Sequence, residues 1–298
     1  MILSGSAHPK LASDLAKKLN TSFAKVEISM FPNGEKRLRV KENLTNKTVI
    51  IVQPFSQPVD EHIIEFCLLQ DAAYHLKAKK IIGVIPWFGY SPQDKLFRSG
   101  EPISAHVVAR LIASSQLDKI FLVDIHSQSS LKHFNVPVTH LSALDLFVDY
   151  FKKSKLQNHL AVALDKGSHQ RTVEFAQKLN IPFIKLKKTR DKSTGKVSFA
   201  DIRHKIRGKN IISYDDFIST GSTQIKANDL LKKNKAKSYI SCVTHCLMAK
   251  GAAAKLKNSS IDQIITTDSY PITKNKRFSK LKILSLSSLI AKALVGEL

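Results

Sequence analysis

The stretch NIISYDDFISTGST, residues 210–223, concentrates the side chains of this sequence that are best suited to chemistry. Its apolar run ends in two adjacent carboxylates, Asp215 and Asp216, and a small hydroxyl-rich turn follows, made of Ser219, Thr220, Gly221, Ser222 and Thr223. Carboxylates accept hydrogen bonds from sugar hydroxyls and bind Mg²⁺ directly or through water. Unpaired N–H groups and the helix dipole favour a phosphate at a helix N-terminus. The stretch therefore predicts a site that holds a sugar phosphate at both ends.

A simpler interpretation is a strand followed by a helix that a Ser, Thr or Asp side chain caps. A cap accounts for one such residue, whereas this stretch combines two acids with the run STGST. The site interpretation is therefore favoured over the cap.

Short β-type runs alternate with amphipathic helical patterns along nearly the whole chain, and these elements must position the acids and hydroxyls. We expect strands at residues 48–53, 80–86, 119–126, 160–165, 210–216, 238–245 and 263–268. Apolar residues at spacings of three and four predict helices at residues 59–78, 103–116, 169–180 and 223–234. Mainly apolar strands that alternate with helices indicate an α/β fold with parallel sheets covered by helices.

The pattern of strands and helices predicts two α/β layers that join near residues 140–150. We expect residues 1–143 to form one domain and residues 144–283 a second, with a C-terminal helix in residues 284–298 that packs back on the first. In open α/β sheets, ligands bind beyond the carboxyl ends of the strands. Most of the chemically interesting residues of this sequence follow such strand ends.

Composition bounds the class of protein. The 298 residues are 43% hydrophobic and 24% charged, which is ordinary for a globular protein. No apolar run approaches the roughly 18 residues that span a bilayer, and MILSGSAHPK lacks the pattern of a signal peptide. We expect a cytoplasmic protein without a membrane partner.

The pair Cys242 and Cys246 in CVTHC lacks a second metal-ligand pair, so buried structural thiols are expected there.

The net charge of +23 is the unusual number. It suits either an anionic small substrate or nucleic acid. The basic residues are scattered, however, with neither a basic tail nor an aromatic-interleaved RNA-binding motif. We therefore expect a lysine-rich solvated surface and no nucleic-acid partner.

Several further segments resemble one enzyme family. The loop at 215–223 resembles the PRPP-binding loop of type I phosphoribosyltransferases and of ribose-phosphate pyrophosphokinases (PRPP synthetases), where PRPP is phosphoribosyl pyrophosphate. The segments that favour the pyrophosphokinases are FPNGEKRLRV, VIPWFGYSPQDKLFRSGEPISAHVVARLI, VDIHS, LDKGSHQR and LKKTRD. Their order and spacing are similar along nearly the whole chain, with the short archaeal-type members the most similar.

The resemblance implies a fold and a reaction. The fold would comprise two type I phosphoribosyltransferase-like domains, each a mainly parallel sheet flanked by helices. The reaction would transfer the pyrophosphoryl group of ATP to the 1-hydroxyl of ribose 5-phosphate, giving PRPP and AMP. Such a transfer depends on alignment and on neutralisation of charge.

The resemblance also implies roles for individual residues. Lys188 and Arg190 match a mobile catalytic loop, and Asp215, Asp216 and residues 219–223 would bind ribose 5-phosphate. The residues implied in ATP binding are Phe31, Asn33, Glu35, Gln93, Asp94 and His126. His126 and Asp165 are implied in binding the Mg²⁺ cofactor. Because the adenine loop of the family comes from a neighbouring subunit, a homo-oligomer of two or more chains is implied.

Three positions depart from the family pattern. Asn33 stands where an Asp is usual, and Ser219 replaces an acid that is common in the synthetase loop. Pro92 stands where the family places an Arg on the ATP phosphates, and proline has no donors to replace it. These departures keep two alternatives open, a catalytically inactive regulatory homologue and a phosphoribosyltransferase that consumes PRPP. A nucleic-acid-binding protein is a third alternative, of a different class.

Overall fold

The computed structural model describes residues 1–114, 116–154, 156–165, 167–186, 188–190, 197–199 and 203–298. At residues 188–190, 197–199, 203 and 204 the description covers the backbone alone. The chain divides into two compact units. The first unit is Met1–Ser142 with Ser269–Pro271 and Ser285–Leu298, and the second is Ala143–Asp268 with Ile272–Leu284.

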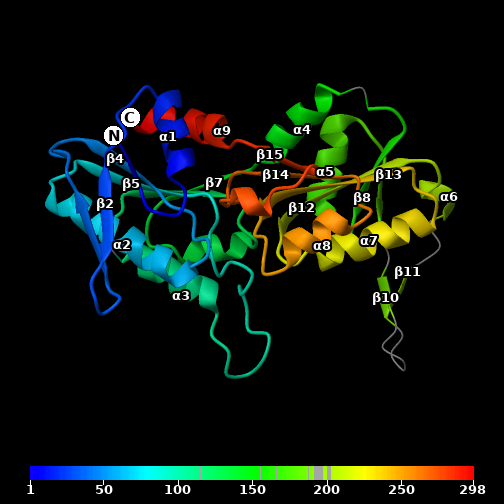
Figure 1. Ribbon diagram of the computed structural model, residues 1–298, viewed down its shortest axis with the longest axis horizontal. Coiled ribbons are helices and arrows are strands. Elements are labelled where there is room, and N and C mark those ends of the chain that lie inside the picture. Colours follow the sequence, from blue (N-terminus) through cyan, green and yellow to red (C-terminus); the bar gives the residue numbers. More distant parts are fainter. Residues whose placement is uncertain (115, 155, 166, 187, 191–196, 200–202) are drawn as a thin grey trace. The chain divides into compact units, whose positions relative to one another are not determined.

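The first unit is built on a five-stranded parallel sheet. Its strands lie in the order β1 (Ile2–Ser4), β4 (Thr48–Val52), β5 (Lys80–Ile85), β6 (Lys119–Val123) and β7 (Val138–Leu141). Its α-helices are α1 (Pro9–Lys18), α2 (Val59–His75), α3 (Ser104–Ala113) and α9 (Ser287–Leu294). Figure 1 shows α2 and α3 on one face of this sheet and α1 and α9 on the other. Because both faces are covered, β4 is buried from Val49 to Val52.

The last residues of the chain belong to the first unit. Helix α9 packs on α1, at the other end of the sequence. Glu297, in the short 3₁₀ helix η3 (Val295–Glu297), pairs with Lys80 at 2.7 Å and with Lys119 at 2.6 Å. These lysines begin β5 and β6, so the C-terminus is tied to the start of two central strands.

A two-stranded antiparallel hairpin also belongs to the first unit. Its strands are β2 (Val26–Met30) and β3 (Lys36–Val40), in register from Val26 opposite Val40 to Met30 opposite Lys36. Charged and apolar residues alternate in KRLRV, which is the pattern of a strand with one exposed face.

The second unit is built on a six-stranded parallel sheet. Its strands lie in the order β15 (Leu281–Leu284), β14 (Gln263–Thr267), β13 (Ser238–Cys246), β12 (Asn210–Ile218), β8 (His159–Ala163) and β9 (Phe183–Lys185). Its helices are α4 (Leu144–Lys152), α5 (His169–Leu179), α6 (Arg203–Ile206), α7 (Ser222–Lys233) and α8 (Ala252–Asn258). Helices α4 and α5 cover one face, and α7 and α8 the other (Figure 1). A second hairpin pairs β10 (Lys188–Arg190) with β11 (Val197–Phe199).

The expected α/β fold class is confirmed. Every strand expected from the sequence is present, with ends shifted by one to three residues, and so is every expected helix. The sequence analysis missed β1, β7, β9, β15 and both hairpins, all made of strands of three to five residues. Within the described residues, no helix is both long and apolar enough to cross a bilayer.

The cysteines of CVTHC lie inside β13, and both are fully buried. Burial raises the pKa of the Cys242 thiol well above its usual range and that of the Cys246 thiol to about 12. The expected burial of both thiols is confirmed, and both stay protonated near neutral pH.

Candidate functional site

Three carboxylates lie on two neighbouring strands of the second unit. Asp165 follows β8, and Asp215 and Asp216 lie in β12, which pairs directly with β8. The strand order reverses at β8, because β9 lies on one side of it and β12 on the other. Adjacent crossovers leave such a point in opposite directions and open a crevice at the carboxyl ends of the strands. The acids therefore stand at the position in this sheet where a ligand is expected.

The acids interact electrostatically. Burial raises the pKa of Asp215 well above its usual range, and the charges of Asp216 and Asp165 raise it further. Each carboxylate thus makes ionisation of Asp215 harder, since like charges repel at close range. A cation at this cluster would relieve that repulsion.

One cation already contacts the cluster. Arg171, in the first turns of α5, places Nη1 3.1 Å from Oδ2 of the buried Asp216. The sequence analysis did not single out Arg171, although it is the last residue of the LDKGSHQR segment. Only its place in that segment could have pointed to Arg171, because its contact with Asp216 joins residues far apart in the sequence.

Asp165 organises the turn that leads from β8 into α5. Its Oδ1 accepts hydrogen bonds from the backbone N–H of Ser168 at 2.9 Å and from Ser168 Oγ at 3.1 Å. The carboxylate is therefore held in a fixed position at the strand end.

Strand β12 continues beyond the two acids, which corrects the expectation that they end it. Asp215 pairs with Val243 of β13, and the ladder runs on to Ile218 opposite Cys246. The long apolar partner β13 extends the pairing, so Asp215 and Asp216 project from within the sheet and the hydroxyl-rich turn begins only at Ser219.

The turn at 219–223 leads directly into α7. Gly221 is left-handed, with φ 79°, and an added Cβ would lie 2.6 Å from Leu256 Cδ2, so this position requires glycine. Thr220 and Ser222 share a hydroxyl–hydroxyl bond of 3.1 Å, and both are exposed. Gly221 is the N-cap residue and has no side chain to cap the helix, while Thr220 Oγ1 accepts a hydrogen bond from the backbone N–H of Ser222 at 3.4 Å. The turn thus presents exposed hydroxyls beside the N–H groups of a helix start, as a phosphate requires.

In the first unit, Phe31, Asn33 and Glu35 lie at the exposed tip of the β2–β3 hairpin. The tip is closed by bonds from Phe31 N to Glu35 O at 2.8 Å and from Gly34 N to Phe31 O at 2.9 Å. Asn33 Oδ1 accepts from Glu35 N at 3.2 Å, a bond that an aspartate oxygen would also make. The departure at Asn33 therefore preserves the turn while removing a charge.

Gln93 and Asp94 lie in the loop between β5 and α3. Gln93 Oε1 accepts from Ser104 Oγ at 2.7 Å, and its backbone carbonyl accepts from Ala105 N at 3.2 Å. The start of α3 thus holds Gln93 in place. Pro92 precedes it and is half-buried.

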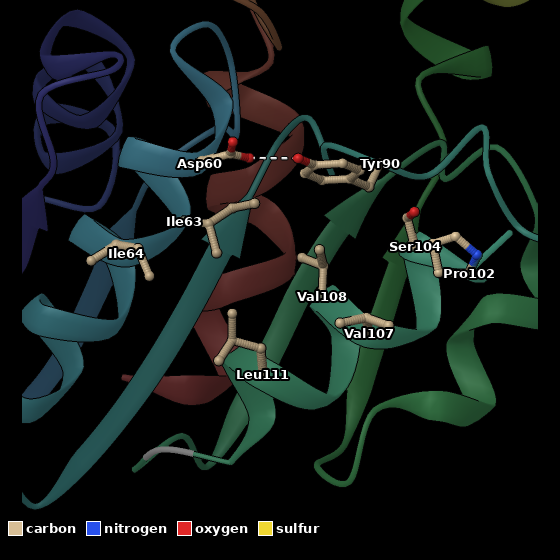
Figure 2. A pocket seen from close by; sticks show the side chains of 9 residues that line it. All are labelled: Asp60, Ile63, Ile64, Tyr90, Pro102, Ser104, Val107, Val108 and Leu111. Atoms are coloured by element: carbon tan, nitrogen blue, oxygen red, sulfur yellow. Dashed lines mark hydrogen bonds between the residues drawn. The ribbon is translucent and has the colours of Figure 1, made fainter.

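A groove of about 310 Å³ runs between α2 and α3 beside this loop. Figure 2 shows Ile63, Ile64, Val107 and Leu111 facing it, with the hydrogen bond from Tyr90 Oη to Asp60 Oδ1, 2.6 Å long, at one end. Among the described residues that line it there is neither a lysine nor an arginine. An aliphatic groove of this kind does not suit the phosphates of a nucleotide.

His126 is exposed and follows β6, at the carboxyl end of the first unit's sheet. Asp165, the other residue implied in metal binding, lies in the second unit. Within the described residues, no group of three or more His, Cys, Asp or Glu side chains is placed to hold a metal ion.

Lys188 and Arg190 lie in β10, where their backbones pair with Phe199 and Val197 of β11. Their side chains lie outside the part of the chain that is described. The structure thus brings Asp165, Asp215 and Asp216 together, followed by the turn at 219–223, and adds Arg171 to them.

Comparisons with known proteins place this geometry in a family. Residues 1–115 match the family model for the N-terminal domain of ribose phosphate pyrophosphokinase, and residues 198–296 that for the phosphoribosyl synthetase-associated domain. The ribose-phosphate pyrophosphokinase of Caldanaerobacter subterraneus subsp. tengcongensis is 32% identical over 99% of this chain and 93% of its own. That of Helicobacter hepaticus is 32% identical over 98% of this chain and 94% of its own.

A solved structure supports the same family. The crystal structure of phosphoribosylpyrophosphate synthetase from Mycobacterium smegmatis has a TM-score of 0.92 and 31% sequence identity, covering 100% of this chain and 98% of that one. With its acids at the reversal of a parallel sheet and relatives that match along its full length, the chain belongs to the ribose-phosphate pyrophosphokinase family.

Proposed function

We propose that this protein transfers the pyrophosphoryl group of ATP to the 1-hydroxyl of ribose 5-phosphate and releases PRPP and AMP. The observation that carries the proposal is the cluster of Asp165, Asp215 and Asp216 at the reversal of the second sheet, with a hydroxyl-rich helix start next to it. Carboxylates for ribose hydroxyls and a helix N-terminus for a phosphate match the two ends of ribose 5-phosphate.

Residue roles follow from this assignment. Asp215 and Asp216 bind the ribose, and residues 219–223 bind its 5-phosphate. Arg171 holds Asp216 through their 3.1 Å contact and keeps that carboxylate aligned. Lys188 and Arg190 neutralise the charge that develops on the transferring phosphoryl oxygens.

The ATP residues belong to the first part of the chain. Phe31 stacks on adenine, Glu35 and Asn33 contact its edge, and Gln93, Asp94 and His126 contact the rest of the nucleotide. In this assignment residues 1–143 form the ATP domain and residues 144–283 the ribose 5-phosphate domain. The exposure of Phe31 at 45% suits a tip that reaches a nucleotide on a second copy of the chain, so we propose a homo-oligomer.

Magnesium fits the donors present. Mg²⁺ keeps several waters and takes one or two carboxylates together with substrate phosphates, so it does not need three protein ligands. The raised pKa of Asp215, caused by burial and then by two neighbouring acids, marks a place where a divalent cation would be stabilising. His126 and Asp165 are each proposed as a magnesium ligand, and a bound magnesium ion would neutralise phosphate charge.

We also propose that the protein is cytoplasmic, because its cysteines, Cys67 among them, are free thiols.

The test is a product assay. The purified protein is mixed with ATP, Mg²⁺ and ribose 5-phosphate, and phosphorus NMR follows the products. PRPP and AMP should form in equal amounts without ADP, because the pyrophosphoryl group moves intact. Loss of PRPP with a free base, and none formed from ATP, would instead identify a phosphoribosyltransferase.

Pro92 favours a second candidate, a catalytically inactive regulatory homologue. A proline at this position cannot supply the forked donors of an arginine to ATP phosphates. If the assay yields neither PRPP nor AMP, even with other nucleotides and added inorganic phosphate, this candidate replaces the first.

A further inference from the structure

Lys36 attaches the tip of the β2–β3 hairpin to the body of the first unit. Lys36 directly follows Glu35 and begins β3. Its Nζ lies 2.6 Å from Oε2 of Glu65 and 3.5 Å from Oε2 of Glu61, both on α2. The Lys36 side chain is 10% exposed, so this contact is far more buried than an ordinary surface ion pair.

Glu65 is a fully buried carboxylate whose oxygens accept hydrogen bonds from three directions. Lys36 Nζ donates at 2.6 Å and Gln53 Nε2 at 2.8 Å, while Ser6 donates from its backbone N–H at 2.5 Å and from Oγ at 2.7 Å. Burial alone would raise the pKa of Glu65, but the bonds from Lys36 and Ser6 outweigh it and lower the pKa. Glu65 therefore stays ionised near neutral pH.

The hydrogen bonds connect the hairpin to the edge of the sheet where the strands end. Ser6 follows β1 and Gln53 follows β4, so both lie at the carboxyl ends of strands. Added at Gly5, a Cβ would lie 2.3 Å from Gln53 Oε1, which shows how closely the chain packs there. A rigid chain of polar contacts thus runs from two strand ends through Glu65 to Lys36.

The hairpin depends on this attachment near its tip. At the other end, Val40 is buried in the core of the unit and Val26 and Leu38 pack against it. Near the tip, Met30 and Phe31 are 60% and 45% exposed. A two-stranded hairpin is marginally stable in water by itself, so Lys36 is what holds the residues beside it.

We propose that Lys36 is a positioning residue for the nucleotide, because its buried ion pair with Glu65 fixes the hairpin tip that carries Phe31, Asn33 and Glu35. The inference rests on the proposed assignment of that tip to adenine. Lys36 itself touches Glu65 and Glu61, not the nucleotide, and acts through the conformation of the tip.

The experiment measures binding and mobility separately. In Lys36→Met, ATP binding is measured by calorimetry without ribose 5-phosphate, and hydrogen–deuterium exchange is followed in peptides that cover residues 26–40. We expect ATP to bind about tenfold more weakly, the loss of roughly one charge-assisted contact, and the hairpin amides to exchange faster. Binding of ribose 5-phosphate should change less than about twofold, because its residues lie in the second unit. Lys36→Arg, which keeps the charge, should recover most of the affinity.

Two further variants separate positioning from stability. Lys41→Met removes an exposed ion pair with Glu27 on the same hairpin and should leave ATP affinity unchanged. Lys36→Met combined with Glu65→Gln leaves no unpaired buried carboxylate, so it should be more stable than Lys36→Met alone. This double variant should still bind ATP weakly.

The outcomes are distinct. Wild-type ATP affinity in the double variant, or unchanged exchange of the hairpin in Lys36→Met, would overturn the inference. A wild-type protein that binds ATP but forms no PRPP would contradict the proposed function without contradicting the proposed role of Lys36. A wild-type protein that does not bind ATP would end both.

Discussion

The two sheets of this protein carry their polar residues in different ways. In the first unit the strands follow one another across the sheet in chain order, from β1 to β7, without a reversal. In the second unit the order reverses at β8, and Asp165, Asp215 and Asp216 gather there. A reversal opens a crevice at the carboxyl ends of the strands. The described sheet of the first unit has no reversal, and the proposed nucleotide residues of this unit lie on a hairpin and on the loops that follow β5 and β6.

The two arrangements differ in burial and in rigidity. The second unit buries Asp216, which pairs with Arg171. The first unit exposes Phe31 and buries the ion pair of Lys36 with Glu65. Substitutions at the reversal should therefore affect turnover and stability together. Substitutions at the exposed hairpin tip of the first unit, such as Phe31, should instead affect ATP affinity with little effect on folding.

The largest effect is expected at Lys188. Lys188→Ala removes a charge proposed to stabilise the transition state, and turnover should fall by about a hundredfold or more. Its backbone lies in a separate two-stranded hairpin, so the melting temperature should stay within a few degrees. Steady-state kinetics and ribose 5-phosphate binding measure the two parts. Turnover close to the wild-type value would remove Lys188 from catalysis.

Asp215→Asn, at the reversal, should change activity and stability together but in opposite directions. Because its pKa is raised in the folded protein, the folded state binds the proton more tightly than the unfolded chain does. Ionisation therefore costs stability as the pH rises above the unfolded value of about 3.9. The variant should melt higher than the wild type at pH 7, lose that advantage near pH 4, and turn over at least about tenfold more slowly. A variant that melts lower at pH 7 would show that the carboxylate stabilises the fold.

Gly221→Ala tests the phosphate turn, with Gly251→Ala as a matched control. Both glycines are left-handed, with φ 79° and 80°, and both precede a helix, but only at Gly221 does a Cβ meet a neighbour, Leu256. Each substitution should cost about 1 kcal/mol of backbone strain. Gly221→Ala should cost about 1–3 kcal/mol more from overpacking and weaken ribose 5-phosphate binding. Equal effects of the two on denaturant unfolding and on binding would exclude the contact with Leu256 as the cause.

The smallest effect is expected from Pro92→Arg in the first unit. A restored charge-assisted contact to ATP phosphates is worth roughly 1.5–3 kcal/mol, so the KM for ATP should fall about tenfold or more. The KM for ribose 5-phosphate should not change. Unchanged ATP kinetics would mean that the loss is immaterial or already compensated.

The sequence predicted the parts of the fold whose signal is local. Runs such as TVIIV and KIIGVI are apolar on both faces, because helices cover both faces of the parallel sheets, and they were recognised. Strands β1 and β9 have three residues each, too few to show a period. Three of the five residues of the hairpin strand KRLRV are basic, which obscures its alternating pattern. The segment was therefore singled out by its resemblance to a family and was not predicted to be a strand.

The candidate site divides in the same way. The acids and hydroxyls of residues 215–223 are contiguous, so their types alone indicated a site. The ion pairs are not contiguous: in the second unit Arg171 reaches Asp216, and in the first unit Lys36 reaches Glu65, only after the chain has folded. No spacing in the sequence encodes those pairs, because tertiary packing brings them together.

The placement of α9 in the first unit has a consequence for how the protein is made. Every residue of the second unit precedes Ser285 and leaves the ribosome before α9 does. The first unit, although it begins the chain, still lacks the helix that packs on α1 and the Glu297 contacts to Lys80 and Lys119. The first unit is therefore completed after the second, and deletion of residues 285–298 should destabilise the first unit.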